Sequence, residues 1–245
     1  MKRYLTLLLM LLCAMGLPWA QAEPFDPWPQ VRQELAELGI TMDDAAFQES
    51  LTAYHEQLRW LREVGFGTEY YATKEYIAYY LLTDAGMGDF ADETWEFTPS
   101  SSQVYALDAE VFNVAIMYTD FLRGVQAIVD DAVFDNVKED ISGINWNSMS
   151  GMTDGHRDVA FTCNGHPYAK RLDSYYDWLN TEIIDFVNDV LRQEGCRGQL
   201  HIISDDYDQI ILLIYGDAER AAALRELIGT RPWEAEEPSL LDWLY

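Results

Sequence analysis

The dipeptide Asn164-Gly165 separates two short runs, 159–163 and 166–170, in which the residues alternate in a pattern typical of strands. Both central residues of a type I′ turn need a positive φ, which Asn and Gly adopt at little cost. The pattern therefore predicts a β-hairpin over residues 158–171. The predicted cross-strand pairs are Cys163 with His166, Phe161 with Tyr168 and Asp158 with Arg171.

A second hairpin is predicted over residues 199–215, around an acidic turn at 205–208. Its unbroken apolar run 210–214 is typical of a strand that is covered on both faces. Between the two hairpins, helical periodicity predicts a long helix that begins at Asp173 or Ser174 and ends at Gly195. This order of elements indicates an α+β fold, with an antiparallel sheet made of hairpins 158–171 and 199–215 and backed by helices.

The residues before the first hairpin are predicted to be mainly helical. Apolar residues recur at three- and four-residue steps in three segments before residue 88, and again from Asp108 onward. Residues 89–103 lack this period and include Pro99 and three serines, so we expect a linker or long connection there. The predicted organisation is a helical region over 23–103 and an α+β domain over 104–245.

Residues 1–22 have the three parts of a secretory signal peptide. Lys2 and Arg3 precede an apolar run, and Ala20-Gln21-Ala22 provides a small-x-small cleavage site, so cleavage is expected after Ala22. The apolar run is shorter than the roughly 20 residues that span a bilayer. The sequence thus predicts a secreted or periplasmic protein, soluble after cleavage, with a lipoprotein anchored at Cys13 as the alternative.

Two cysteines, Cys163 and Cys196, remain after removal of this signal peptide. An even number of cysteines in an exported chain favours a disulfide, because the compartment is oxidising. The predicted bond joins the first hairpin to the end of the following helix. Two buried free thiols are the alternative.

The charge of the chain limits the partners that it can bind. Its formal net charge is −26, and loss of Lys2 and Arg3 with the signal peptide lowers it to −28. Such a surface repels phosphate backbones and anionic lipids, which argues against nucleic-acid binding and against membrane association after cleavage. It favours a basic partner, as in inhibitors that neutralise a cationic enzyme.

No catalytic motif is complete in the sequence. His156-Arg157-Asp158 matches a kinase tripeptide without the rest of the kinase set, and the glycines at 86 and 88 follow a helical pattern instead of a strand. A thiol nucleophile at Cys163 with His166 across the ladder would compete with the disulfide. The histidines show no zinc-ligand spacing and no cofactor is indicated, although the acidic clusters leave a structural calcium ion as an alternative.

The favoured hypothesis is an exported, acidic, non-enzymatic protein that binds another protein or an extracellular polymer. Its candidate contact residues are Trp146, Asn147 and Asp154, because a long polar loop over 143–155 carries a single large aromatic side chain. In the alternative, Trp146 folds back over the sheet.

The alternative function is a secreted, glycosidase-like hydrolase that uses a carboxylate pair in a cleft between the two regions. A pocket with two carboxylates and an exposed Trp or Tyr would favour the hydrolase, whereas a flat acidic face would favour the binding protein. The sequence does not specify the ligand or the oligomeric state.

Overall fold

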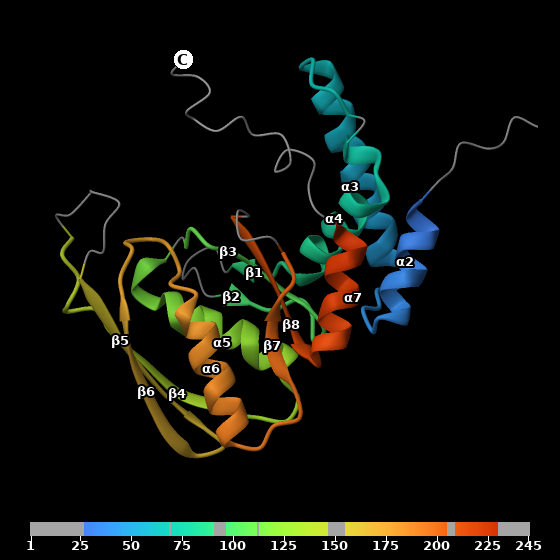
Figure 1. Ribbon diagram of the computed structural model, residues 1–245. Helices are drawn as coiled ribbons and strands as arrows, with labels where there is room; N and C mark the ends of the chain where they lie inside the picture. The colour runs from blue at the N-terminus through green and yellow to red at the C-terminus, as the bar shows by residue number, and fades with distance from the viewer. Residues whose placement is uncertain are drawn as a thin grey trace, which may run out of the picture.

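A computed structural model describes residues 27–68, 70–90, 97–111, 113–146, 155–204 and 209–229 (Figure 1). Its helices are α2 (Trp28–Glu37), α3 (Asp44–Glu63), α4 (Lys74–Gly86), α5 (Met117–Ile128), α6 (Glu182–Gln193) and α7 (Ala218–Ile228), with short 3₁₀ turns η1 (Tyr70–Ala72) and η2 (Val114–Ile116). Its strands are β1 (Asp89–Phe90), β2 (Phe97–Thr98), β3 (Tyr105–Asp108), β4 (Phe134–Asp140), β5 (His156–Cys163), β6 (His166–Asp173), β7 (Gln199–Ile202) and β8 (Ile210–Gly216). The helices come first and the sheets with further helices follow, which confirms the α+β class.

The first predicted hairpin is confirmed with its register. Strands β5 and β6 pair antiparallel, and β4 joins β5 on the other side to complete a three-stranded sheet. Asn164 and Gly165 have φ values of 51° and 85°, as a type I′ turn requires. The observed pairs include Cys163 with His166, Phe161 with Tyr168 and Asp158 with Arg171.

The second predicted hairpin, β7–β8, lies in a separate sheet. Its order is β3-β8-β7, with all neighbours antiparallel. The third strand, β3, comes from the segment just before the point where periodicity predicts a helix starting at Asp108. That helix, α5, begins only at Met117 because the chain first forms the strand and a 3₁₀ turn.

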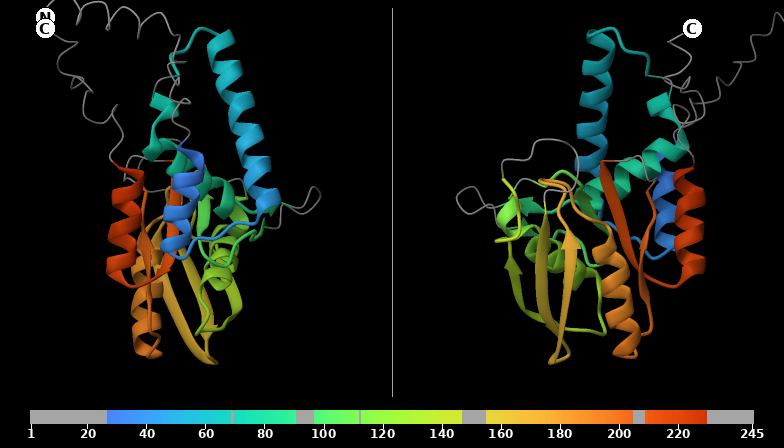
Figure 2. Two further views of the ribbon diagram at one scale, coloured as in Figure 1. Left: turned by 90° about the vertical axis from the view of Figure 1, so that its right-hand side faces the viewer. Right: turned by 60° about the vertical axis from the view of Figure 1, so that its left-hand side comes forward.

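Strand β8 is buried on both faces, as its unbroken apolar run predicts. Ile211 and Leu213 belong to a core formed with α5, α6 and the inner face of β5. Leu212 and Ile214 belong to a second core formed with α2, α3, α4 and α7. Strand β3 behaves in the same way, with Tyr105 and Leu107 in the first core and Ala106 in the second. The two cores therefore share the β3-β8-β7 sheet (Figure 1). The C-terminal end of α3 extends beyond the rest of the described chain (Figure 2).

The segment between β6 and α6 is the largest departure from the predicted elements. Residues 174–181 are not helical, and α6 begins at Glu182. The side chain of Asn180 accepts a hydrogen bond of 2.9 Å from the Glu182 amide and so forms a local turn. Tyr176 has a φ of 60°, which a right-handed helix does not allow. This non-helical turn brings its aromatic residues to the surface.

Candidate binding surface

Four exposed aromatic side chains lie at one end of the β4-β5-β6 sheet. They are 41–49% exposed, and we call them the aromatic patch: Trp146, Tyr175, Tyr176 and Trp178. Trp146 follows β4, whereas the other three come from the turn before α6. The rings of Trp146 and Tyr176 meet edge to face, with centroids 6.3 Å apart. Trp146 is thus exposed beside a second aromatic ring.

We call the non-helical segment 174–181 the aromatic turn. Its backbone is held by hydrogen bonds to the segment after β3. The Val111 amide donates to the Asp177 carbonyl at 2.6 Å, and the Leu179 amide donates to the Ala109 carbonyl at 2.8 Å. Within the turn, the Trp178 amide donates to the Tyr175 carbonyl at 3.2 Å. At the first residue of the turn, the Ser174 amide donates to the Gly155 carbonyl at 3.0 Å. Because the turn is held at both 174 and 177–179, its aromatic side chains project from a fixed backbone.

A buried arginine lies beneath this turn. Arg157, in β5, is 1% exposed, and its guanidinium donates to the carbonyl of Val114 in η2 and to the carbonyl of Tyr176 at 3.4 Å. Its Nη1 atom is 3.6 Å from Oε2 of Glu139, a residue of β4 whose side chain is 4% exposed. The guanidinium of Arg157 therefore connects strands β4 and β5 with η2 and with the aromatic turn.

Burial of this ion pair disfavours the charged forms of both side chains. Burial raises the pKa of Glu139, although its carboxylate accepts hydrogen bonds from the amide (2.7 Å) and hydroxyl (2.8 Å) of Thr119. Burial also lowers the pKa of Arg157, although the charge of Glu139 acts in the other direction. Desolvation disfavours the charged form of both groups. The pair persists because each partner is hydrogen-bonded and compensates the charge of the other.

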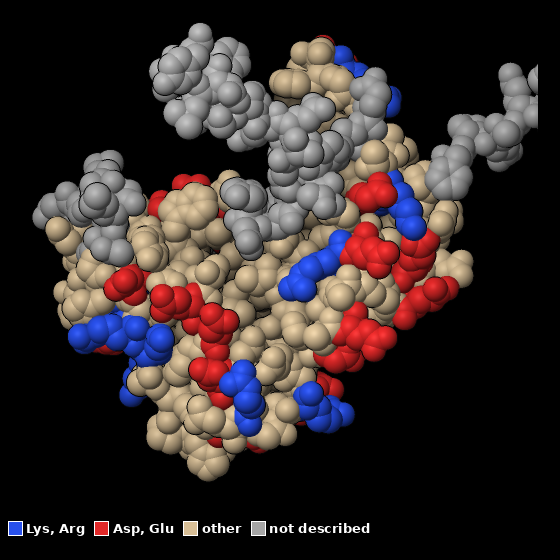
Figure 3. Space-filling model, viewed as in Figure 1, with Lys and Arg blue, Asp and Glu red and all other residues tan. Residues whose placement is uncertain are grey.

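Carboxylates border the aromatic patch. Asp177 lies within the turn, and Asp173 is exposed at the end of β6 just before it. Exposed Glu110 forms a β-bridge with Trp178 and accepts a hydrogen bond of 3.1 Å from Gln209. Acidic side chains also gather over α6, α2 and α7, with basic side chains scattered among them (Figure 3). The patch therefore combines aromatic faces with negative charge.

The two predicted disulfide residues are free thiols in the structure, and both pack in or against the first core. Cys163 ends β5, and Cys196 follows the end of α6, where its Sγ is 3.7 Å from the Asp131 carbonyl oxygen. Burial raises the pKa of Cys163 to about 12, with further contributions from the charges of Glu194 and Cys196. Pairing of the two cysteines stays a prediction.

The thiol-nucleophile alternative does not fit this geometry. Cys163 faces His166 as predicted, but Nδ1 of His166 is 2.9 Å from Oε1 of Glu194. Cys163 is fully buried, and its raised pKa disfavours the thiolate that a nucleophile needs.

The other sequence-predicted site residues divide into two groups. Trp146 lies in the aromatic patch, whereas Asn147 and Asp154 lie outside the described residues, as does the predicted signal peptide 1–22. Within the described ranges, no group of three or more His, Cys, Asp or Glu side chains could hold a metal ion. No helix in that part of the chain combines the length and apolar character needed to cross a bilayer.

Comparison of the chain with protein-family models, curated proteins and solved structures gives no match.

Sequence reasoning missed three members of the aromatic patch. Tyr175 fits the apolar stripe of the helix predicted from 173 or 174. Tyr176 and Trp178 fall within the same predicted helix, so they were not expected in an exposed turn. The signal that could have separated them is Asn180 followed by Thr181 and Glu182, because Asn is a preferred residue at a helix start.

The raised pKa of Glu139 predicts a pH dependence of stability. The folded protein keeps this proton to a higher pH than the unfolded chain, so the free energy of unfolding due to this group falls as the pH rises above 4.5. We compare the free energy of unfolding of the wild type with that of Glu139→Gln. As the pH rises above 4.5, the wild type should lose stability relative to the variant, until Glu139 is ionised in the folded state. Urea unfolding at several pH values measures this difference, and a difference independent of pH would contradict the prediction.

A disulfide between Cys163 and Cys196 would change the mass and the stability of the protein by measurable amounts. Under oxidising conditions, a Cys163–Cys196 bond would lower the mass by two hydrogens, and the loop-entropy estimate for its 33-residue separation is roughly 3 to 4 kcal/mol. The double variant Cys163→Ser, Cys196→Ser should lose stability by that order under oxidising conditions and much less under reducing conditions. Two alkylatable thiols in the wild type refolded under oxidising conditions would refute the pairing.

Proposed function

We propose that this chain is an exported binding protein whose aromatic patch contacts a basic segment of a partner protein. The observation that carries the proposal is the aromatic patch itself, in which Tyr176 lies directly above the buried Arg157–Glu139 pair and carboxylates border the rings. A rigid, exposed aromatic surface has little role in stabilising an isolated fold, whereas Trp and Tyr dominate the energetics of protein interfaces.

The chemistry of the patch favours cationic side chains. Arg and Lys bind to the faces of Trp and Tyr through cation–π attraction, which is strengthened where water is excluded. Glu110, Asp173 and Asp177 supply carboxylates at the same place for charge-assisted hydrogen bonds. The strongly negative net charge of −26 would steer a basic partner toward the protein and raise its association rate.

Export is part of the proposal and is supported by residues 1–22. Their basic start, apolar run and small-x-small end are those of a cleavable signal peptide. The proposed location is therefore the periplasm or the extracellular space. There the partner is a protein, with an extracellular polymer as the competing class of ligand.

A second candidate function, a hydrolase, is favoured by one observation. A cavity of about 210 Å³ is lined in part by Asp108, Glu110 and Asp120, and its lining residue Leu179 directly follows exposed Trp178. It has the carboxylates and neighbouring aromatic residue that a glycosidase uses. However, most of its wall is apolar, which offers a sugar few hydrogen bonds. Hydrolysis of a polysaccharide by the purified protein, lost in Glu110→Gln, would favour this candidate over binding alone.

The aromatic patch predicts the effect of removing its rings. Tyr176→Ala with Trp178→Ala should weaken binding of a hexa-arginine peptide at physiological salt by about tenfold, because cation–π contacts are lost while every charge remains. The matched control is Trp60→Ala with Phe66→Ala, which removes two exposed rings at the end of α3. This control should bind as the wild type does, as measured by titration calorimetry.

Two outcomes of this titration would contradict the proposal. Equal binding by the patch variant and the control would show that net charge alone attracts the peptide. Binding of a neutral polysaccharide to the patch, in place of the peptide, would assign the surface to an extracellular polymer.

A further inference from the structure

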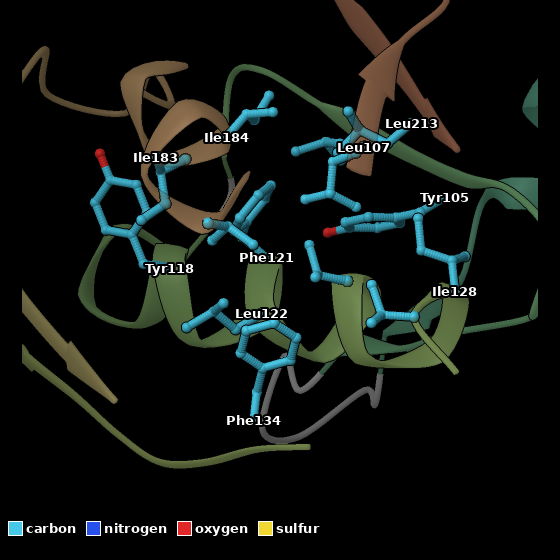
Figure 4. Packing of buried hydrophobic residues seen from close by; sticks show 14 of the residues in the cluster. Tyr105, Leu107, Tyr118, Phe121, Leu122, Ile128, Phe134, Ile183, Ile184 and Leu213 are labelled. Atoms are coloured by element: carbon cyan, nitrogen blue, oxygen red, sulfur yellow. The ribbon is translucent and has the colours of Figure 1, made fainter. Parts of the chain in front are cut away.

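An apolar cavity of about 210 Å³ lies between β3 and α5, and Leu179 of the aromatic turn is part of its lining. Figure 4 labels the lining residues Tyr105, Leu107 and Phe121, with the Tyr105 ring above α5 and its hydroxyl directed toward Phe121. The apolar wall consists of Met87, Phe97, Ala106, Leu107, Val111, Met117, Phe121 and Leu179. A cavity of roughly 150 Å³ with such a lining accommodates benzene, so this one has room for a ring with a short chain.

A glycine holds Tyr105 in position at this cavity. A Cβ atom at Gly124 would lie 2.2 Å from Cζ of Tyr105, so the ring packs directly on the α5 backbone. Among the described residues, none forms a hydrogen bond with the Tyr105 hydroxyl, although the residue is only 4% exposed. The hydroxyl oxygen is not among the fully buried side-chain atoms that lack a partner, although the residue as a whole is buried. It is therefore available to a molecule bound in the cavity.

The charged groups at the cavity are all acidic. Asp120 is 6% exposed and accepts a hydrogen bond of 2.9 Å from Arg123, and Asp108 and Glu110 are exposed residues of the lining. Tyr105 and Asp120 line the same cavity. Burial raises the pKa of Tyr105, and the charge of Asp120 raises it further. No Lys, Arg or His is among the described residues that line the cavity.

We propose that this cavity binds a small amphipathic amine, with its apolar body against the wall and its ammonium group between Asp120 and the Tyr105 hydroxyl. An ammonium group donates hydrogen bonds and accepts none, so it suits a carboxylate and a phenolic oxygen. Carboxylates on the lining repel an anionic ligand of the same size. The apolar wall leaves the hydroxyls of a sugar unsatisfied.

This proposal goes beyond binding at the aromatic patch. The patch is an exposed surface for a macromolecule, whereas the cavity takes a free small molecule. Leu179 lines the cavity and directly follows Trp178, so the two sites are adjacent. A variant of each site therefore has to be measured for both ligands.

The probes for the cavity are 2-phenylethylamine, 2-phenylethanol and phenylacetate, which are similar in size and differ in charge. Titration calorimetry on the full chain should show saturable binding of the amine, at least tenfold tighter than that of the alcohol. Phenylacetate should not bind. Equal affinity for all three, or no saturable binding of the amine, would overturn the proposal.

Asp120→Asn tests the role of the buried carboxylate. We expect this change to reduce amine binding at least tenfold and to leave binding of the alcohol unchanged. The matched control is Asp189→Asn, since Asp189 forms the same type of i,i+3 ion pair with Arg192 (2.7 Å) on the exposed face of α6. If Asp120→Asn does not fold, Tyr105→Phe replaces it, with an expected loss of several-fold for the amine. Undiminished amine binding by the folded variant would refute the assignment.

A patch variant separates this proposal from the proposed function. Tyr176→Ala should keep amine binding intact while peptide binding falls. If amine binding falls with it, the amine binds at the aromatic patch and the cavity assignment is wrong. If the peptide fails to bind any variant but the amine binds as expected, the cavity stands without the proposed partner.

Discussion

The buried guanidinium of Arg157 is the constraint on which the proposed binding surface depends. A charged group without water is stable only if other groups replace its hydration, and here Glu139 and the carbonyls of Val114 and Tyr176 do so. Removal of one partner from a buried ion pair costs about 3 to 5 kcal/mol, because the other charge is left uncompensated. The conformation of the aromatic turn is therefore coupled to the integrity of the sheet.

A second constraint is the two-sided burial of β8. Its alternating residues enter two different cores, and those of its neighbour β3 do the same, so both cores share the β3-β8-β7 sheet. This arrangement positions β3, the neighbour of β8, and with it the segment 109–111 that hydrogen-bonds to the aromatic turn. The surface site thus depends on packing from both halves of the chain.

The parts of the fold that the sequence predicts correctly are those set by local chemistry. Asn164 and Gly165 specify the turn and register of the first hairpin, because only positive φ values close it. Strand β3 was not predicted because Tyr105–Asp108 becomes a strand by pairing with β8, about a hundred residues later in the chain. Tertiary pairing of this kind leaves no short-range signal.

The candidate sites also divide into features that local sequence indicates and features that only tertiary packing creates. Trp146 was predicted from its place in a polar loop, but Tyr176 and Trp178 were missed because helical periodicity was assumed from Asp173 or Ser174 onward. The cavity was not predictable, since its wall combines Met87, Tyr105, Phe121 and Leu179 from four segments. Periodicity identifies which residues are apolar, and only packing shows where they leave space.

The most direct test of the role of Arg157 is amide hydrogen exchange in Arg157→Lys. Lysine keeps the positive charge but lacks the fork of donors that reaches both carbonyls. The amides of Val111, Trp178 and Leu179 should exchange faster in this variant, while the control Arg171→Lys, at an exposed ion pair, leaves them protected. Unchanged protection of these amides in folded Arg157→Lys would show that the aromatic turn holds its conformation without the buried arginine.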